Sequence, residues 1–228
     1  PLRDPAGDPV GITGVAVDIT QRKESEAHLR LLMREITHRS KNLLAVIQAM
    51  ARQTARHCGS IDTFLEQFGA RLQALAASHD LLVSEGWHGA SLHDLVQSQL
   101  STYQDRFTGR INYEGPPIRL KPEAAQALGL ARHELVSNAV KYGALSGDRG
   151  TVTVSWRRQL AADGSGVEFV WAEQAFAEVK PPARRGVGSS VIERHLARSL
   201  DTDVELHFAS EGVRCRVQIP LVQFVAMP

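Results

Sequence analysis

Cysteine is scarce in this sequence of 228 residues, which contains only Cys58 and Cys215. Neither thiol stands at a spacing used for metal ligands or for redox pairs. The pattern argues against a site built from cysteines, and we expect two reduced, structural thiols.

An excess of one charge and a long apolar run are also absent. The 26 basic and 25 acidic residues give a formal net charge of +1, so no bulk field attracts nucleic acid or anionic lipid, and any phosphate site must be local. No apolar run approaches the roughly 20 residues that span a bilayer, and no signal-peptide pattern opens the chain. We expect a cytoplasmic protein with no nucleic-acid partner and no membrane segment. Because the sequence starts at Pro1, we also expect a fragment of a longer chain.

The first 60 residues divide into a strand region and a long helix. A turn-prone segment at residues 4–8 and a strand pattern over residues 10–19 suggest a hairpin remnant without its sheet. Thr20 stands where it can cap the polar helix that follows. That helix is expected to run to about Arg56, with a break at residues 59–60.

His38 lies on the water-facing side of this helix. At 100° per residue, one apolar stripe is formed by Leu29, Leu32, Ile36, Leu43, Ile47 and Met50. His38 falls near the opposite side, one turn from Arg34 and Asn42. A neutral imidazole there has one nitrogen free to attack an electrophile, and nearby cations can hold an anionic phosphoryl donor. The alternative is a solvated surface histidine, which the helix alone would favour.

A second helix is expected over residues 61–85. Its stripe repeats at alternating spacings of three and four and contains Leu65, Phe68, Leu72, Leu75, His79 and Leu82. Two antiparallel helices bury such stripes only partly against each other, so a four-helix bundle made by two chains is the natural completion. We expect a homodimer, with a monomer as the alternative.

From Trp87 onward the pattern changes to mixed α and β. Helices are expected from Ser91 to about residue 100, at 122–144 and at 189–199, and strands at 110–114, 151–159, 166–173, 203–209 and 212–219. We expect the helices to cover one face of a mixed sheet.

The helix at 122–144 carries a second set of polar residues. Glu134, Asn138 and Lys141 are spaced four and three apart, which puts them on one helix face. The trio suits a nucleoside triphosphate, because the amide oxygen can bind Mg²⁺, the ammonium can contact phosphate and the carboxylate can orient a nucleophile. The alternative is a solvated face with a mild ion pair between Glu134 and Lys141.

Three ordered motifs together resemble the HWE subfamily of bacterial sensor histidine kinases, over most of residues 25–220. They are His38-Arg39-x-Lys41-Asn42-Leu43-Leu44, His133-Glu134-x-x-x-Asn138-Ala139-x-Lys141-Tyr142 and Trp171-x-Glu173. The resemblance implies an α+β fold: a two-helix antiparallel dimerisation and phosphoacceptor hairpin, then an α/β-sandwich ATP-binding domain of the histidine kinase (GHKL, Bergerat) type. It implies a sensor-domain remnant at 1–20, a helical dimerisation and phosphotransfer region at 21–88 and a catalytic domain at 89–228.

The resemblance also implies roles for single residues. His38 matches the phosphoacceptor, which takes the γ-phosphoryl group of ATP and passes it to an aspartate of a response-regulator receiver domain. Glu134 matches the polarising base, beside His133. Asn138 matches the Mg²⁺ ligand, and Lys141 and Tyr142 belong to the ATP-binding motif.

Glu173 occupies the place of the carboxylate that recognises the adenine amino group. A carboxylate can accept a hydrogen bond from that amino group, whereas it would repel the carbonyl group of guanine. Trp171 is expected to be a packing residue beside it. Arg185, Gly186, Gly188 and Ser189 resemble a second glycine box ahead of a helix, where glycines let the backbone approach phosphate.

The sequence departs from the family pattern after Glu173. Glycines and a proline are usual there, but this chain has Gln174-Ala175-Phe176-Ala177-Glu178. The departure leaves open a non-catalytic phosphotransfer or regulator-binding scaffold with a degenerate ATP-binding domain. An ATPase or serine kinase on the same fold is the weaker third alternative. Residues 1–20 resemble the end of a PAS domain, so an upstream sensor domain is expected in the full-length chain.

Overall fold

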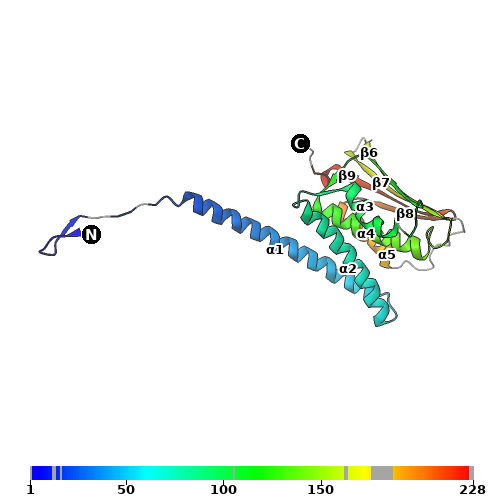
Figure 1. The fold of residues 1–228 in the computed structure, drawn as a ribbon, viewed down its shortest axis with the longest axis horizontal. Coiled ribbons are helices and arrows are strands. Elements are labelled where there is room, and N and C mark those ends of the chain that lie inside the picture. Colours follow the sequence, from blue (N-terminus) through cyan, green and yellow to red (C-terminus); the bar gives the residue numbers. More distant parts are fainter. Residues whose placement is uncertain are drawn as a thin grey trace. The chain divides into compact units, whose positions relative to one another are not determined.

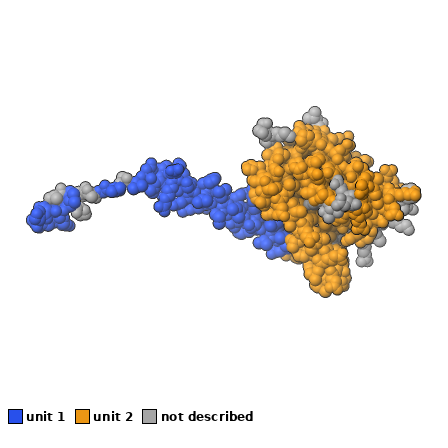
Figure 2. All heavy atoms as spheres, viewed as in Figure 1, with its two compact units in different colours: residues 1–49 blue, residues 50–228 orange. Residues whose placement is uncertain are grey.

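The computed structural model describes residues 2–11, 14–15, 17–104, 106–161, 164–175 and 187–225. These residues form two compact units, 1–49 and 50–228, which are coloured separately in Figure 2 and are taken one at a time below.

The first unit contains a short hairpin and most of a long helix. Strands β1 (Leu2–Arg3) and β2 (Pro9–Gly11) pair antiparallel, and the Asp4 carboxylate closes their turn by accepting the N–H groups of Ala6 and Asp8. The expected hairpin is therefore present. The strand predicted over residues 10–19 is wrong at residues 14–15 and 17–19, which carry no strand, whereas residues 12, 13 and 16 lie outside the described residues.

Helix α1 (Thr20–Ala55) is capped by a residue other than the one predicted. Thr20 is already inside the helix, and its N–H donates at 2.8 Å to the carboxylate of Asp18. Hydrogen bonds from the Thr20 side chain and backbone lower the pKa of Asp18, since they favour its charged form. An aspartate offers two acceptor oxygens and a negative charge at the positive end of the helix, which a threonine does not.

The second unit is a five-stranded sheet with helices on one face (Figure 1). The strand order is β4-β6-β7-β9-β8, in which β4 and β6 run parallel and the other neighbours antiparallel. The bounds are β4 (Ile111–Glu114), β6 (Thr151–Ala161), β7 (Gly164–Gln174), β8 (Val204–Ala209) and β9 (Gly212–Pro220). A small separate pair is formed by β3 (Ala90–Ser91) and β5 (Arg119–Leu120).

The helices are those expected, with shifted ends. They are α2 (Ile61–Ser84), α3 (Leu92–Gln104), α4 (Pro122–Lys141) and a helical run of α5 (Val187–Ser190), a π-helical turn (Val191–His195) and α6 (Leu196–Leu200). Alternate side chains of the central strands meet these helices in one core that includes Val154, Phe169, Trp171 and Val217. The predicted α+β class, with helices on one face of a mixed sheet, is confirmed.

Helix α2 buries only part of the predicted stripe. Leu75 and Leu82 of that stripe are buried, as expected, but Leu65 and Leu72 are exposed, and Arg71, Ala74 and Ser78 complete the buried face. This face packs on α4, and Leu82 belongs to the main core. The small side chains let two helices approach closely, so the second half of α2 is part of the sheet unit.

Helix α4 is almost entirely enclosed. Its first turn starts with Pro122, and helix propensity is high through an alanine-rich stretch. It ends at Lys141, three residues before the predicted end, where the N–H groups of Tyr142 and Gly143 donate to the carbonyl of Asn138. The buried side chains include Leu128, Leu135 and Ala139, as expected from their spacing.

His195 gives a prediction for stability against pH. Burial lowers its pKa below 6.5, with a smaller contribution from Arg198, so the folded protein holds this imidazole neutral while the unfolded chain protonates it. Stability is full above pH 6.5 and falls as the pH drops below it, by up to about 1.4 kcal/mol per pH unit for one proton. Urea unfolding between pH 5 and 7 should show this slope, and His195→Gln should reduce it, while the buried His133 maintains the rest. An equal slope in both proteins, with exposed His28→Gln as the control, would contradict it.

Candidate functional site

The predicted trio on α4 lines one pocket. Glu134, Asn138 and Lys141 border a cavity of about 210 Å³, together with His133 and Ser137 of the same helix, Tyr142 directly after it and Gly188 of α5. The opposite wall is formed by His57, which follows α1, and by Gln67, Ala70 and Arg71 of α2. A cation and an amide oxygen face the same space, which suits a phosphorylated ligand.

Glu134 is held on the pocket wall by a residue that sequence reasoning did not identify. Nε of Arg71 donates to Oε1 at 2.6 Å, and Nη2 donates to Oε2 at 3.0 Å. The side chains are 7% and 5% exposed, so this is a buried, bidentate ion pair. The predicted leucine stripe did not include Arg71, which the structure places on the buried face of α2 with Ala74 and Ser78.

Gly188 approaches this pair closely. A Cβ added there would lie 2.7 Å from Oε2 of Glu134 and 3.2 Å from Nδ2 of Asn138. Glycine therefore allows the α5 backbone to lie against both predicted site residues. The structure brings Gly188 into the pocket, while Ser189 is buried and does not line it. Arg185 and Gly186 lie outside the described residues.

Gly188→Ala should therefore destabilise the protein. The new methyl group meets a carboxylate that Arg71 fixes, so it cannot move aside freely, and overpacking of this kind costs about 1–3 kcal/mol. Gly69→Ala in α2 is the matched control, because nothing lies within 4 Å of the added Cβ. Alanine there should stabilise the helix by about 0.5–1 kcal/mol. Thermal unfolding of both variants checks the pair, and an unchanged melting temperature for Gly188→Ala would contradict the close contact.

His133 faces the pocket, whereas the preceding residue, Arg132, faces the core. Burial lowers the pKa of His133, which Glu134 partly opposes, so a neutral imidazole lines the pocket. Arg132 points the other way into the core, where one nitrogen donates to the carbonyl of Val96 at 2.6 Å. Burial lowers its pKa to about 9.

Glu173 lies beside the residues that follow the C-terminal end of α4, and it does not line this pocket. Its Oε2 accepts the N–H of Ala144 at 2.9 Å, and its Oε1 accepts the indole N–H of Trp171 at 3.1 Å. Burial raises the pKa of Glu173, and these two hydrogen bonds oppose the shift. Trp171 is fully buried, so the packing role expected for it is correct, and it also fixes the carboxylate.

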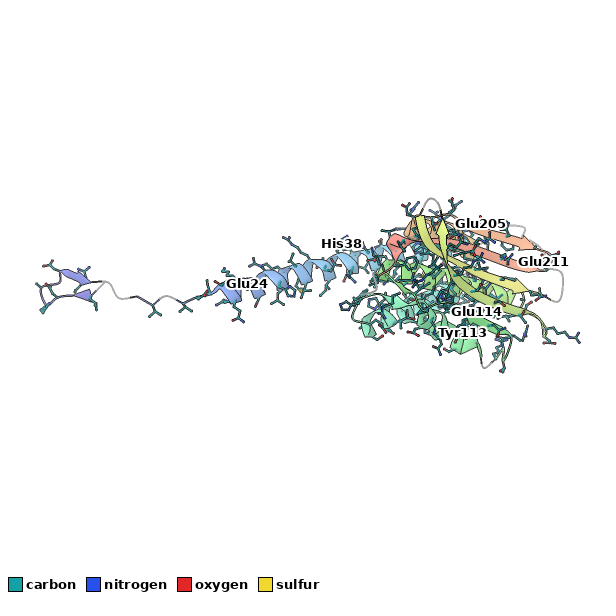
Figure 3. All side chains as sticks on the ribbon, turned by 90° about the horizontal axis from the view of Figure 1, so that it is seen from above. Glu24, His38, Tyr113, Glu114, Glu205 and Glu211 are labelled. Carbon is teal, nitrogen blue, oxygen red and sulfur yellow. The ribbon has the colours of Figure 1, made fainter. Side chains whose placement is uncertain are left out.

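His38 belongs to the other unit. Its side chain is exposed on α1, where Figure 3 labels it, and its Nδ1 lies 3.5 Å from the Asn42 side-chain amide. The neighbouring cation Arg39 pairs with Glu35 at 2.7 Å. The imidazole is thus open to a ligand, as the sequence suggested, and an amide one turn away can hold one of its nitrogens.

Two larger hollows, about 530 and 440 Å³, lie on the exposed face of the sheet. The first is lined by β7, β8 and β9 residues that include Glu205 and Glu211, both labelled in Figure 3. A surface network of ion pairs joins Glu168 to Arg157 and Arg216, and Arg216 to Glu205. None of the predicted site residues except Glu173 lines either hollow, so we place the candidate site in the smaller pocket.

The described residues contain no preformed metal cage. No group of three or more histidine, cysteine, aspartate or glutamate side chains lies together in the part of the chain that the structure covers. Asn138 nevertheless fits a magnesium ion that arrives with phosphates, because Mg²⁺ in such sites takes few protein ligands. No helix among the described residues has both the length and the apolar character needed to cross a bilayer.

Comparisons with known proteins agree on one family. A family model described as HWE histidine kinase matches residues 35–117. A blue-light-activated histidine kinase of Brucella ovis is 36% identical over 210 residues, which cover 92% of this chain and 43% of that protein. The protein of the same name from Brucella anthropi is 34% identical and is covered to 44%. The chain thus spans less than half the length of these relatives.

Two solved structures share the fold. The blue-light activated histidine kinase of Erythrobacter litoralis matches with a TM-score of 0.59 and 19% identity, over 94% of this chain and 63% of that one. The separate histidine kinase domain of the same protein gives 0.57 and 20%, over 88% and 95%. The helical hairpin followed by a five-stranded sheet unit is therefore a histidine kinase fold.

Proposed function

Because residues 35–117 match the HWE histidine kinase family model, we propose that this chain is the kinase region of a sensor protein that phosphorylates His38 from Mg-ATP. The proposal is carried by one observation: Glu134, Asn138 and Lys141 line the same pocket, against the backbone of Gly188. This places a carboxylate, a hard oxygen ligand and a cation around the space that a triphosphate would occupy.

The reaction assigns each group one task. One imidazole nitrogen of His38 attacks the γ-phosphorus, so that an N–P bond forms while the bond from that phosphorus to the bridging oxygen breaks and ADP leaves. The proton of the other nitrogen goes to Glu134. The Asn42 side-chain amide, 3.5 Å from Nδ1 of His38, can orient the imidazole for this attack.

Asn138 would hold Mg²⁺, which supplies charge neutralisation at the phosphates, and Lys141 would add a point charge. Tyr142, 76% exposed at the end of α4, borders the same opening. Glu173 would accept a hydrogen bond from the adenine amino group. It would use the lone pairs that the hydrogen bonds from Ala144 and Trp171 leave free. His133 would stay neutral beside the base.

The partners follow from this chemistry. The phosphoryl group would pass from His38 to an aspartate of a response-regulator receiver domain, and a sensor domain before residue 20 of the full-length protein would control the reaction. A receiver domain and ATP are both met in the cytoplasm, which is the location we propose.

We further propose that residues 21–88 mediate a homodimer. Leu29, Leu32 and Ile36 are 45–59% exposed on one stripe of α1, and a second copy that covers the exposed half of each would contribute about 1 kcal/mol per side chain. Sedimentation should give twice the chain mass of 25.0 kDa, and Leu32→Glu with Ile36→Glu should give a monomer. Leu31→Glu, exposed off the stripe, is the control. A monomer of the unaltered protein at assay concentrations would refute the dimer.

The kinase proposal is tested by labelling. The chain is incubated with Mg²⁺ and γ-labelled or α-labelled ATP, and the label is tested in acid and alkali and mapped by mass spectrometry. Only the γ-label should be incorporated, it should be lost in acid, and it should lie on the peptide that contains His38. Asn138→Ala or removal of Mg²⁺ should suppress it. An acid-stable label would refute the assignment, and absence of any label from a chain that binds regulator would favour a scaffold.

A further inference from the structure

The two oxygens of Glu134 are already occupied. Arg71 donates to both of them, at 2.6 and 3.0 Å, and the residue is 4% exposed. Each oxygen keeps a further lone pair, but the guanidinium charge stabilises the carboxylate anion that a proton would neutralise, so transfer from an imidazole N–H is favoured once Arg71 gives way. The described arrangement is therefore a resting one for the proposed reaction.

Arg71 has a second hydrogen-bond partner, Thr54, besides Glu134. Its Nη1 donates to Oγ1 of Thr54 at 3.1 Å, and that hydroxyl donates to the carbonyl of Met50 at 2.7 Å. Of the five N–H donors of a guanidinium, three are used in these contacts. The hydroxyl holds the terminal nitrogen Nη1, so Nε and Nη2 can exchange one acceptor for another without loss of this contact.

The pocket offers the acceptor for that exchange. Arg71 lines the same 210 Å³ cavity as Asn138 and Lys141, so a phosphate bound there would lie beside the guanidinium. A planar guanidinium fork matches phosphate oxygens as well as it matches a carboxylate, and a nucleoside triphosphate carries several negative charges against one on Glu134. Electrostatics therefore favour transfer of Arg71 to the phosphate once nucleotide enters.

We propose that Arg71 is a phosphate-responsive residue that binds Glu134 in the nucleotide-free protein and the terminal phosphate of a bound nucleoside triphosphate. It rests on the proposed function, since it takes Glu134 as the base and the pocket as the nucleotide site. The exchange frees the carboxylate only when a phosphoryl donor is present. Because ADP lacks the terminal phosphate, Arg71 should discriminate between ATP and ADP.

Nucleotide affinity tests this without any phosphorylation step. The affinities of the intact chain for Mg-ATP and Mg-ADP are measured by calorimetry, in the unaltered protein, in Glu134→Gln and in the double variant Arg71→Met with Glu134→Gln. Glu134→Gln releases Arg71 from its carboxylate and should raise the preference for ATP over ADP. The double variant should lose that preference by about tenfold relative to Glu134→Gln, with little change in ADP affinity.

Both comparisons can overturn the proposal. Equal ATP-to-ADP ratios in Glu134→Gln and in the double variant would show that Arg71 does not contact the terminal phosphate. If the double variant fails to fold by circular dichroism, the comparison of Glu134→Gln with the unaltered protein remains, and an unchanged ratio there has the same meaning. Binding of both nucleotides without the predicted ratios would leave the proposed function standing. Failure of the unaltered chain to bind either nucleotide would overturn both proposals.

Discussion

Replacing His38 by alanine should reduce acid-labile phosphorylation to background. Alanine removes the nitrogen that forms the N–P bond, and no other group of the reaction can supply it. The loss should leave folding intact, because the His38 side chain is exposed on α1 and its one described contact is to Asn42. Labelling from γ-labelled ATP at equal protein concentration, with nucleotide affinity measured in parallel, checks the result.

His28→Ala is the matched control, since this histidine is exposed on the same helix. It should retain the label. Label that survives in His38→Ala, or that disappears equally in His28→Ala, would move the phosphoacceptor to another position. Mixing His38→Ala with Asn138→Ala then separates transfer between chains, which restores the label, from transfer within one chain, which does not.

Replacing Glu134 by glutamine should lower the rate of phosphorylation by about 10²–10⁴, the range associated with a positioned general base. The same change leaves the buried Arg71 without its counter-ion, and breaking such a pair costs about 3–5 kcal/mol of stability. A low rate alone would therefore not separate chemistry from folding.

Adding Arg71→Met to Glu134→Gln separates the two effects. Removal of the unpaired cation should restore most of the melting temperature, because a buried ion pair can be replaced by neutral groups at little cost. It should not restore the label. Single-turnover rates and thermal unfolding of the two variants provide the measurements. A double variant that regains both stability and rate would exclude Glu134 as the base.

Regular patterns in the sequence predicted the elements that depend on near neighbours. The three-and-four spacing of Glu134, Asn138 and Lys141 correctly places them around one pocket, and the alternation in β6 and β7 correctly predicts a sheet with one buried face. The strand expected at residues 14–15 and 17–19 is wrong because alternation shows only that a segment can pair. In residues 2–11, β2 pairs with β1, and that partner is only two residues long.

Contacts between distant residues could not be predicted in the same way. Arg71 and Glu134 are 63 residues apart, and nothing local to either identifies the other. The leucine stripe of α2 indicated a helix but not its neighbour, and packing on α4 selects the face with Ala74 and Ser78 because small side chains permit close approach. Burial on a helix is decided by what packs there as well as by periodicity.

The hydrogen bond from Trp171 to Glu173 gives the protein an internal optical reporter. Indole fluorescence responds to the electric field at the ring, and here an oxygen of the Glu173 carboxylate lies 3.1 Å from the indole nitrogen. An adenine base that hydrogen-bonds to Glu173 would redistribute the charge of this carboxylate and shift the emission of Trp171. The other two tryptophans, Trp87 and Trp156, lie elsewhere in the fold. Occupancy of the adenine end could then be followed by light emission in real time, without a label and separately from any transfer of phosphate.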